Sequence, residues 1–151
     1  MKNKYVSTIN IICMVQFIAI ILYLIIGWNS FPEQIPGHFN AAGEVTRYDG
    51  RGALLIGPIV GGLLFGGLVL LGRFPQVWNT GVKVTEENRE RIYRIVGNLI
   101  ATMSLAITTS FVFITIVQST ASRLPSWFTP ASLAATFVPM LFFIVKLIKS
   151  R

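Results

Sequence analysis

Long runs of apolar residues constrain the fold of this chain more than any other feature. A helix needs about 20 such residues to cross the roughly 30 Å hydrocarbon core of a bilayer. Three runs have this length, and a shorter fourth run spans if Pro130 begins its helix and Lys146 extends toward the membrane surface. The expected helices cover residues 6–28, 53–71, 92–117 and 130–148. The sequence therefore predicts an all-α integral membrane protein, a four-transmembrane-helix bundle in one domain over residues 1–151.

The composition supports a bilayer as the solvent. Hydrophobic residues make up 53% of the chain and charged residues only 13%, which is more apolar than a water-facing surface tolerates. Cys13 is the only cysteine and lies inside the first apolar run, so an intrachain disulfide and a site of paired cysteines are excluded. We expect no metal and no cofactor.

The basic residues indicate an orientation. If all four helices span, ten of the 13 lie on the side of the termini and of the loop 73–91, and three lie on the side of the loop 29–52. An excess of Lys and Arg marks cytoplasmic loops. We therefore expect a multi-pass protein of the cell membrane with both termini in the cytoplasm and the loop 29–52 outside. The three on the outer side are Arg47, Arg51 and Arg123.

The net charge of +7 indicates lipid more than nucleic acid as a partner. The cations flank apolar spans and do not form one basic face interleaved with aromatic residues, so anionic lipid headgroups are the expected partner. Trp28, Trp78 and Trp127 fall near expected helix ends, where an indole ring suits the headgroup depth.

Small residues predict how the helices pack. The second helix carries glycines at i,i+4 spacing, which predicts a face that another backbone approaches closely. These are Gly57, Gly61, Gly62, Gly66 and Gly67. The third helix offers a similar stripe and is the expected mate, within one chain or across a homo-oligomer. This stripe consists of Gly97, Ala101, Ser104 and Thr108.

The loop 29–52 differs from the apolar runs because it contains residues typical of an ordered turn. Two prolines four residues apart stiffen it, while Asn40 and Gly43 suit a turn that needs a positive φ. We expect an ordered, folded-back loop whose apolar side chains rest on the membrane or cap the bundle. Those side chains are Phe31, Ile35, Phe39 and Tyr48.

The motif in this loop resembles the bacterial membrane family known as domain of unknown function 1648, which also forms the N-terminal part of SdpI-type immunity proteins. The matching residues are Pro32, Ile35, Pro36, His38, Phe39, Asn40 and Gly43. Two positions depart from the family pattern: Thr46 stands where Asp is usual, with Asp49 three residues later, and Arg51 stands where Lys is usual. The resemblance implies a stand-alone version of this domain.

The resemblance implies a non-enzymatic module, related to SdpI-type immunity and signalling proteins, that binds a peptide or membrane-protein partner. The motif residues with Asp49 and Arg51 are then the candidate binding residues. An accessory subunit of a membrane complex or transporter is the alternative. Transport itself is disfavoured because no charged side chain lies deep in a predicted span, and interhelical hydrogen bonds account for Asn10, Gln16 and Asn98.

A membrane enzyme that depends on His38 is a further alternative. Imidazole carries protons near neutral pH and is a good metal ligand. However, one histidine with scattered carboxylates at Glu33, Glu44 and Asp49 matches no known ligand spacing, and no nucleophile motif accompanies it. A structural role for His38 and Asn40 in fixing the loop is favoured.

Overall fold

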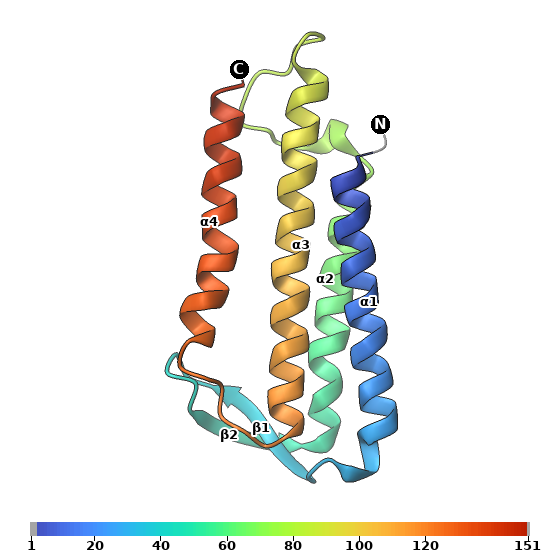
Figure 1. The fold of residues 1–151 in the computed structure, drawn as a ribbon, viewed down its shortest axis with the longest axis vertical. Helices are drawn as coiled ribbons and strands as arrows, with labels where there is room; N and C mark the ends of the chain where they lie inside the picture. Colours follow the sequence, from blue (N-terminus) through green and yellow to red (C-terminus); the bar gives the residue numbers. More distant parts are fainter. Residues whose placement is uncertain (1–2, 151) are drawn as a thin grey trace.

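Four long helices make up most of the computed structural model, which describes residues 3–150 (Figure 1). The helices are α1 (Lys4–Gly27), α2 (Ile56–Gly72), α3 (Arg89–Ser119) and α4 (Phe128–Ile148). Each belongs to a segment that is long and apolar enough to cross a membrane. The predicted four-helix membrane architecture is confirmed, and the helix ends differ from the predicted ones by at most three residues.

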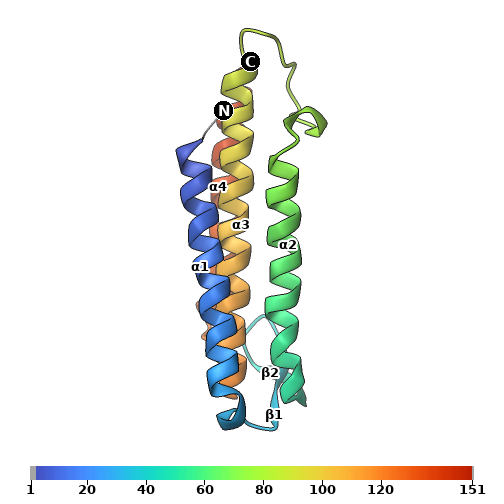
Figure 2. The same ribbon diagram turned by 90° about the vertical axis from the view of Figure 1, so that its right-hand side faces the viewer.

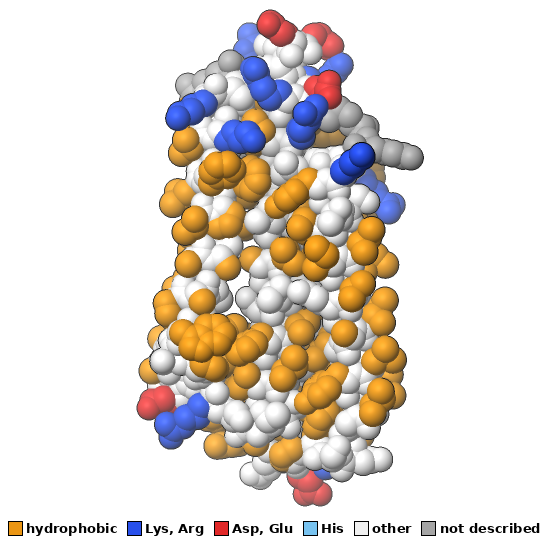
Figure 3. All heavy atoms as spheres, in the orientation of Figure 1, with side chains coloured by type: hydrophobic (Ala, Val, Ile, Leu, Met, Phe, Trp, Pro, Cys, Tyr) orange, Lys and Arg blue, Asp and Glu red, His pale blue; other side chains and the backbone are white. Residues whose placement is uncertain are grey.

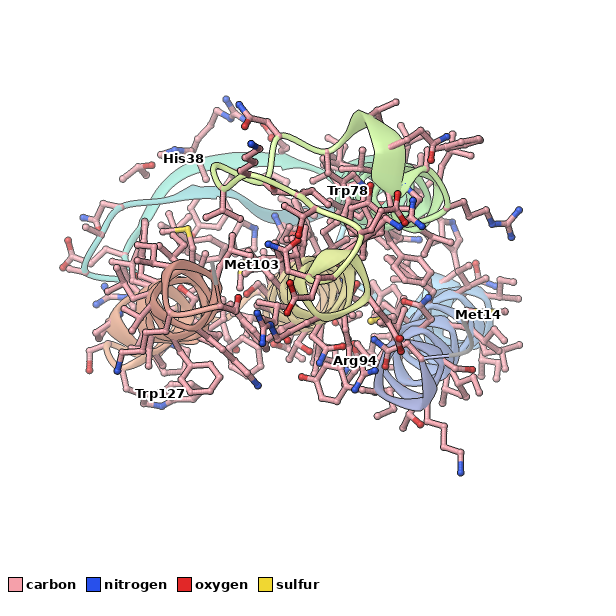
Figure 4. All side chains as sticks on the ribbon, turned by 90° about the horizontal axis from the view of Figure 1, so that it is seen from above. Met14, His38, Trp78, Arg94, Met103 and Trp127 are labelled. Atoms are coloured by element: carbon pink, nitrogen blue, oxygen red, sulfur yellow. The ribbon has the colours of Figure 1, made fainter. Side chains whose placement is uncertain are left out.

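Helix α3 is the centre of the bundle. It packs against each of the other three helices, with α1 and α2 on one side and α4 on the other (Figure 4). Helices α1 and α3 run in one direction and α2 and α4 in the other (Figures 1 and 2). Few side chains of α4 are shielded by protein, and its buried residues are Phe128 and Phe143.

A set of side-chain hydrogen bonds, here called the α1–α3 ladder, joins the two parallel helices. Its partners are separated in sequence by 93 to 97 residues, the constant offset of parallel neighbours. The pairs are Asn3–Asn98 (2.6 Å), Tyr5–Thr102 (2.9 Å), Gln16–Thr109 (3.0 Å) and Tyr23–Ser119 (2.7 Å). Interhelical hydrogen bonding is thus confirmed for Gln16 and Asn98, whereas the Asn10 side chain has no hydrogen-bond partner within residues 3–150.

Only part of the glycine stripe on α2 is a packing face. A Cβ atom at Gly57 would meet the Thr115 hydroxyl, and one at Gly61 would lie 3.2 Å from Phe111, both on α3. Gly62, Gly66 and Gly67 have no other part of the chain within 4 Å of such a Cβ. The prediction of one face through all five glycines is therefore wrong within the chain, because at 3.6 residues per turn residue 66 lies opposite residue 57.

The small residues of α3 do not face the α2 glycines. Ala101 packs with Ile9 and Cys13 of α1, and a Cβ at Gly97 would lie nearest Trp78 and Val6. The pairing of α2 with α3 is as predicted, but the α3 residues that meet the glycines are Phe111 and Thr115, farther along the helix. The stripe that begins at Gly97 borders an open space described below.

The chain divides its polar segments between two ends. The terminus end holds both termini and the segment 73–88, which contains the short helix Pro75–Val77. The hairpin end holds the segment 28–55 and the loop 120–127 (Figure 1). Figure 3 shows a band of apolar side chains around the helices, with Lys and Arg gathered at the terminus end on the face drawn.

A reciprocal cap precedes α3. The Asn88 N–H donates to the Thr85 hydroxyl (3.3 Å), and the Thr85 N–H donates to the Asn88 side-chain oxygen (2.8 Å). The cap explains how a turn starting at Glu86 leads into the helix that is regular from Arg89 onward.

Candidate functional site

The loop with the sequence motif folds into a β-hairpin. Strand β1 (Gln34–Phe39) pairs antiparallel with β2 (Val45–Gly50), with Gln34 opposite Gly50 and Phe39 opposite Val45. The register shifts at Pro36 and His38, where the ladder is irregular. An ordered, folded-back segment was predicted, but its strands were not.

Asn40 organises the turn between the strands. Its side-chain oxygen accepts hydrogen bonds from the N–H groups of Ala42 and Glu44, both at 3.0 Å, and its amide nitrogen donates to the Glu44 carboxylate at 2.9 Å. Gly43 follows with a φ of +82°, the left-handed region in which glycine is favoured. The two residues fulfil the turn role that the sequence predicts.

Gly43 also fastens the turn to the loop between α3 and α4. Its carbonyl oxygen accepts a hydrogen bond from the Leu124 N–H at 3.0 Å, and a Cβ atom at Gly43 would overlap the Leu124 carbonyl oxygen. Leu124 in turn packs with Val117 and Phe128, against which Phe39 also rests. The tip of the hairpin is therefore held against the ends of α3 and α4.

The base of the hairpin is held by a second apolar cluster. Ile35 is fully buried with Phe31, Leu54 and Leu24, so the hairpin packs on the ends of α1 and α2. The predicted capping of the bundle is confirmed for Phe31, Ile35 and Phe39, whereas Tyr48 is 58% exposed.

Two polar side chains add to the attachment. The Gln118 amide of α3 donates to the carbonyl oxygen of the buried Pro36 at 2.8 Å. The Arg51 guanidinium donates to the carbonyl oxygens of Trp28 (3.2 Å) and Pro32 (3.4 Å). Arg51 therefore connects the end of the hairpin to the segment that follows α1. Gln118 connects β1 to α3.

His38 and Thr46 form a pair on the exposed side of the hairpin. His38 Nδ1 lies 2.7 Å from the Thr46 hydroxyl oxygen, and the Thr46 hydroxyl group donates to the His38 carbonyl oxygen at 3.3 Å. Nε2 of His38 has no hydrogen-bond partner among the described residues. Figure 4 shows His38 on the side of the hairpin that faces away from the helices.

The remaining exposed surface lies on β2. Thr46, Arg47 and Tyr48 are all exposed, and Arg47, the register partner of His38, forms an ion pair with Asp49 at 2.8 Å. A Cβ atom at Gly37 would overlap the Asp49 carboxylate, so Gly37 makes room for it.

The candidate binding residues thus divide into two groups. Most of them build and fasten the hairpin, namely Pro32, Ile35, Pro36, Phe39, Asn40, Gly43 and Arg51. Among these candidates, only His38 presents outward a group without a hydrogen-bond partner in the described residues, the ring nitrogen Nε2, and its Nδ1 lies beside Thr46. Sequence reasoning named Thr46 only as a departure from a pattern, and it missed Gln118 and Leu124, whose contacts depend on the tertiary fold.

The carboxylates near His38 have other partners. Glu44 accepts from Asn40, and Asp49 pairs with Arg47. Within residues 3–150, no three His, Cys, Asp or Glu side chains are grouped so that they could hold a metal ion. The geometry of the hairpin is that of an ordered surface with an exposed imidazole.

Four helices that are long and apolar enough to cross a membrane, with an ordered hairpin at one end, fit a multi-pass membrane protein. Residues 15–62 match the family model described as domain of unknown function (DUF1648). The chain carries this domain, which runs from α1 through the hairpin into α2 and contains the whole motif. No curated protein and no solved structure matches the chain.

Proposed function

We propose that the chain is a non-enzymatic membrane protein that binds an extended peptide or a protein partner at the hairpin. The observation that supports this most directly is the contrast between the two strands. Strand β1 is buried at Ile35 and Pro36, while most residues of β2 are exposed. A strand that is held firmly and yet exposed is a suitable template for a partner.

The free edge of β2 offers one mode of recognition. The sheet has two strands, and within residues 3–150 the backbone of β2 has no hydrogen-bond partner besides β1. An extended peptide adds to such an edge through main-chain hydrogen bonds, while side chains give the specificity. Here Thr46, Tyr48 and the imidazole of His38 are the groups that a partner would contact.

The charge distribution supports an outward-facing hairpin. The hairpin end carries three basic and three acidic residues, whereas the terminus end carries ten basic and three acidic residues. Because basic ends stay in the cytoplasm, the termini lie inside and the hairpin meets partners outside the cell membrane. In this arrangement the chain would act in immunity or signalling in the manner of SdpI-type proteins.

Site-specific photo-cross-linking tests the binding surface. A benzophenone amino acid at Tyr48 should give a discrete adduct in native membranes, and the same substitution at Phe74, an exposed aromatic at the terminus end, should not. Equal adducts at both positions, or none above background, would refute partner binding at the hairpin.

The immunity role has a separate readout. Cells that lack the chain should be more sensitive to a secreted peptide toxin, and the chain with an intact hairpin should restore resistance. A specific adduct at position 48 with unchanged toxin sensitivity would leave partner binding standing and rule out immunity.

A further inference from the structure

An open cavity of about 850 Å³ lies at the terminus end between α1, α2 and α3. This volume is within the range of small-molecule sites. Figure 4 looks onto this end and shows Trp78 and Arg94, which both line the cavity, near α3. The deeper lining residues are Ser7, Asn10, Leu68, Val69, Gly97 and Ser104.

The walls of the cavity are held in place by packing. The Trp78 indole N–H donates to the Leu71 carbonyl oxygen at 2.8 Å, and its ring lies edge-on to Tyr93 at 5.7 Å between centroids. A Cβ atom at Gly97 would be in ordinary contact with Trp78 at 3.7 Å and with Val6 at 3.9 Å, so a larger side chain at this lining position would extend into the cavity. The Trp78 ring therefore forms a fixed wall of the cavity.

The mouth of the cavity carries one arginine without an ion-pair partner. Arg89 pairs with Glu86 at 2.9 Å and Arg94 pairs with Glu90 at 2.7 Å. Arg73 also lines the cavity and has no ion pair within residues 3–150. Its charge is available for an anion.

Polar and apolar groups share the deeper part. Asn10 brings an amide without a hydrogen-bond partner in the described residues, and Ser7 lies one turn before it on α1. Leu68 and Ile100 provide apolar walls. An amide left without a partner in hydrocarbon is costly, so a polar occupant beside Asn10 is favoured.

The depth of the cavity matches one leaflet of a bilayer. Arg94 and Ser104 both line it and are ten residues apart on α3, which is about 15 Å at 1.5 Å per residue. This is half of the roughly 30 Å hydrocarbon core. The cavity thus runs from a cationic mouth into the apolar region.

We propose that this cavity binds one anionic phospholipid of the adjacent leaflet. The phosphate pairs with Arg73, the ester region meets Ser7 and Asn10, and an acyl chain lies between Leu68 and Ile100. Basic pockets between membrane helices are a recurrent form of lipid headgroup site. The proposal concerns the end opposite the hairpin and does not depend on the function proposed for the hairpin.

Fluorescence of Trp78 tests the proposal. In a Trp28→Phe, Trp127→Phe background it is the only tryptophan, and the protein is placed in phosphatidylcholine vesicles with increasing brominated phosphatidylglycerol. We expect saturable quenching at a low mole fraction. Arg73→Gln should raise the half-saturating fraction about fivefold, as expected for one cation at a headgroup. Lys83→Gln, which removes a cation outside the cavity, should leave it unchanged.

Two glycine-to-leucine variants and two other ligands complete the test. Gly97→Leu fills the cavity and should abolish saturable quenching, while Gly62→Leu adds the same bulk in open space on α2 and should not. If the Gly97→Leu variant loses its helical circular dichroism, it has not folded, and the comparison of Arg73→Gln with Lys83→Gln then tests the proposal. Equal quenching by brominated phosphatidylcholine would mean bulk lipid only, and displacement by soluble glycerol 3-phosphate would mean a site for free anions. Either result, or an unaltered Arg73→Gln, would overturn the proposal.

Discussion

The Thr46 hydroxyl oxygen lies 2.7 Å from Nδ1 of His38, across the two strands of the hairpin. In the family pattern that the motif resembles, position 46 is usually Asp. The structure therefore makes positions 38 and 46 spatial partners, eight residues apart. In this chain a neutral hydroxyl occupies the place from which a carboxylate would contact the imidazole.

Removing the hydroxyl should free the imidazole ring of His38. In Thr46→Val the side chain keeps its shape but has no oxygen near Nδ1, so the 2.7 Å hydrogen bond is lost. We expect the NMR signal of the ring nitrogen Nδ1 to move at a fixed pH, and its assignment is unambiguous because His38 is the only histidine. Thr46→Ser, which keeps a hydroxyl, should leave this signal close to that of the parent chain, and an equal change in both variants would contradict the pairing.

Gly43→Ala should loosen the tip of the hairpin. Its φ of +82° disfavours a side chain, and the added Cβ would overlap the Leu124 carbonyl oxygen. We expect a loss of about 2 kcal/mol in the free energy of unfolding in detergent. Gly52→Ala, where no other atom lies within 4 Å of the new Cβ, is the control. The role given to Gly43 is wrong if the two variants unfold alike.

A leucine should destabilise the protein at an α2 glycine that contacts α3, but not at an α2 glycine that faces open space. Gly61→Leu would force Phe111 of α3 away, since a Cβ already lies 3.2 Å from it, and should cost about 1–3 kcal/mol. Gly66→Leu faces open space and should change the unfolding midpoint little. A larger loss for Gly66→Leu would show that its face packs against a second copy of the chain.

The orientation can be read from two introduced cysteines in a Cys13→Ser background. Ala41 at the hairpin tip and Gln76 in the segment after α2 are both exposed. In the proposed orientation, with the basic terminus end in the cytoplasm, a membrane-impermeant maleimide should label Ala41→Cys on intact cells and Gln76→Cys only after lysis. Labelling of both residues from outside would contradict four spans, and the reverse pattern would invert the orientation.

The sequence was sufficient to predict the helices because each is encoded by a local run of apolar residues. The contacts between helices were harder to predict from the sequence. Five glycines looked like one packing face, yet the helical period spreads them around α2 and only Gly57 and Gly61 reach α3. Phe111 and Thr115 are their neighbours because of the axial offset between α3 and α2. No local sequence pattern specifies that offset.

The strands were missed for a related reason. Pro32 and Pro36 argue against a regular strand, but Pro36 lies where β1 is irregular and its carbonyl oxygen bonds to Gln118 of α3. Asn40 and Gly43 did indicate the turn between the two strands. The partner of the turn, Leu124, is 81 residues farther along the chain, and sequence spacing alone gives no sign of it.

The α1–α3 ladder has a consequence for biogenesis. Asn3, Gln16 and Tyr23 enter the bilayer long before Asn98, Thr109 and Ser119 are synthesised, and the intervening residues include the hairpin and all of α2. Until α3 arrives, these polar groups must rely on water, lipid headgroups or a chaperone. A nascent chain released after α2 would keep them unsatisfied, so quality-control proteases should recognise that fragment and spare the finished bundle.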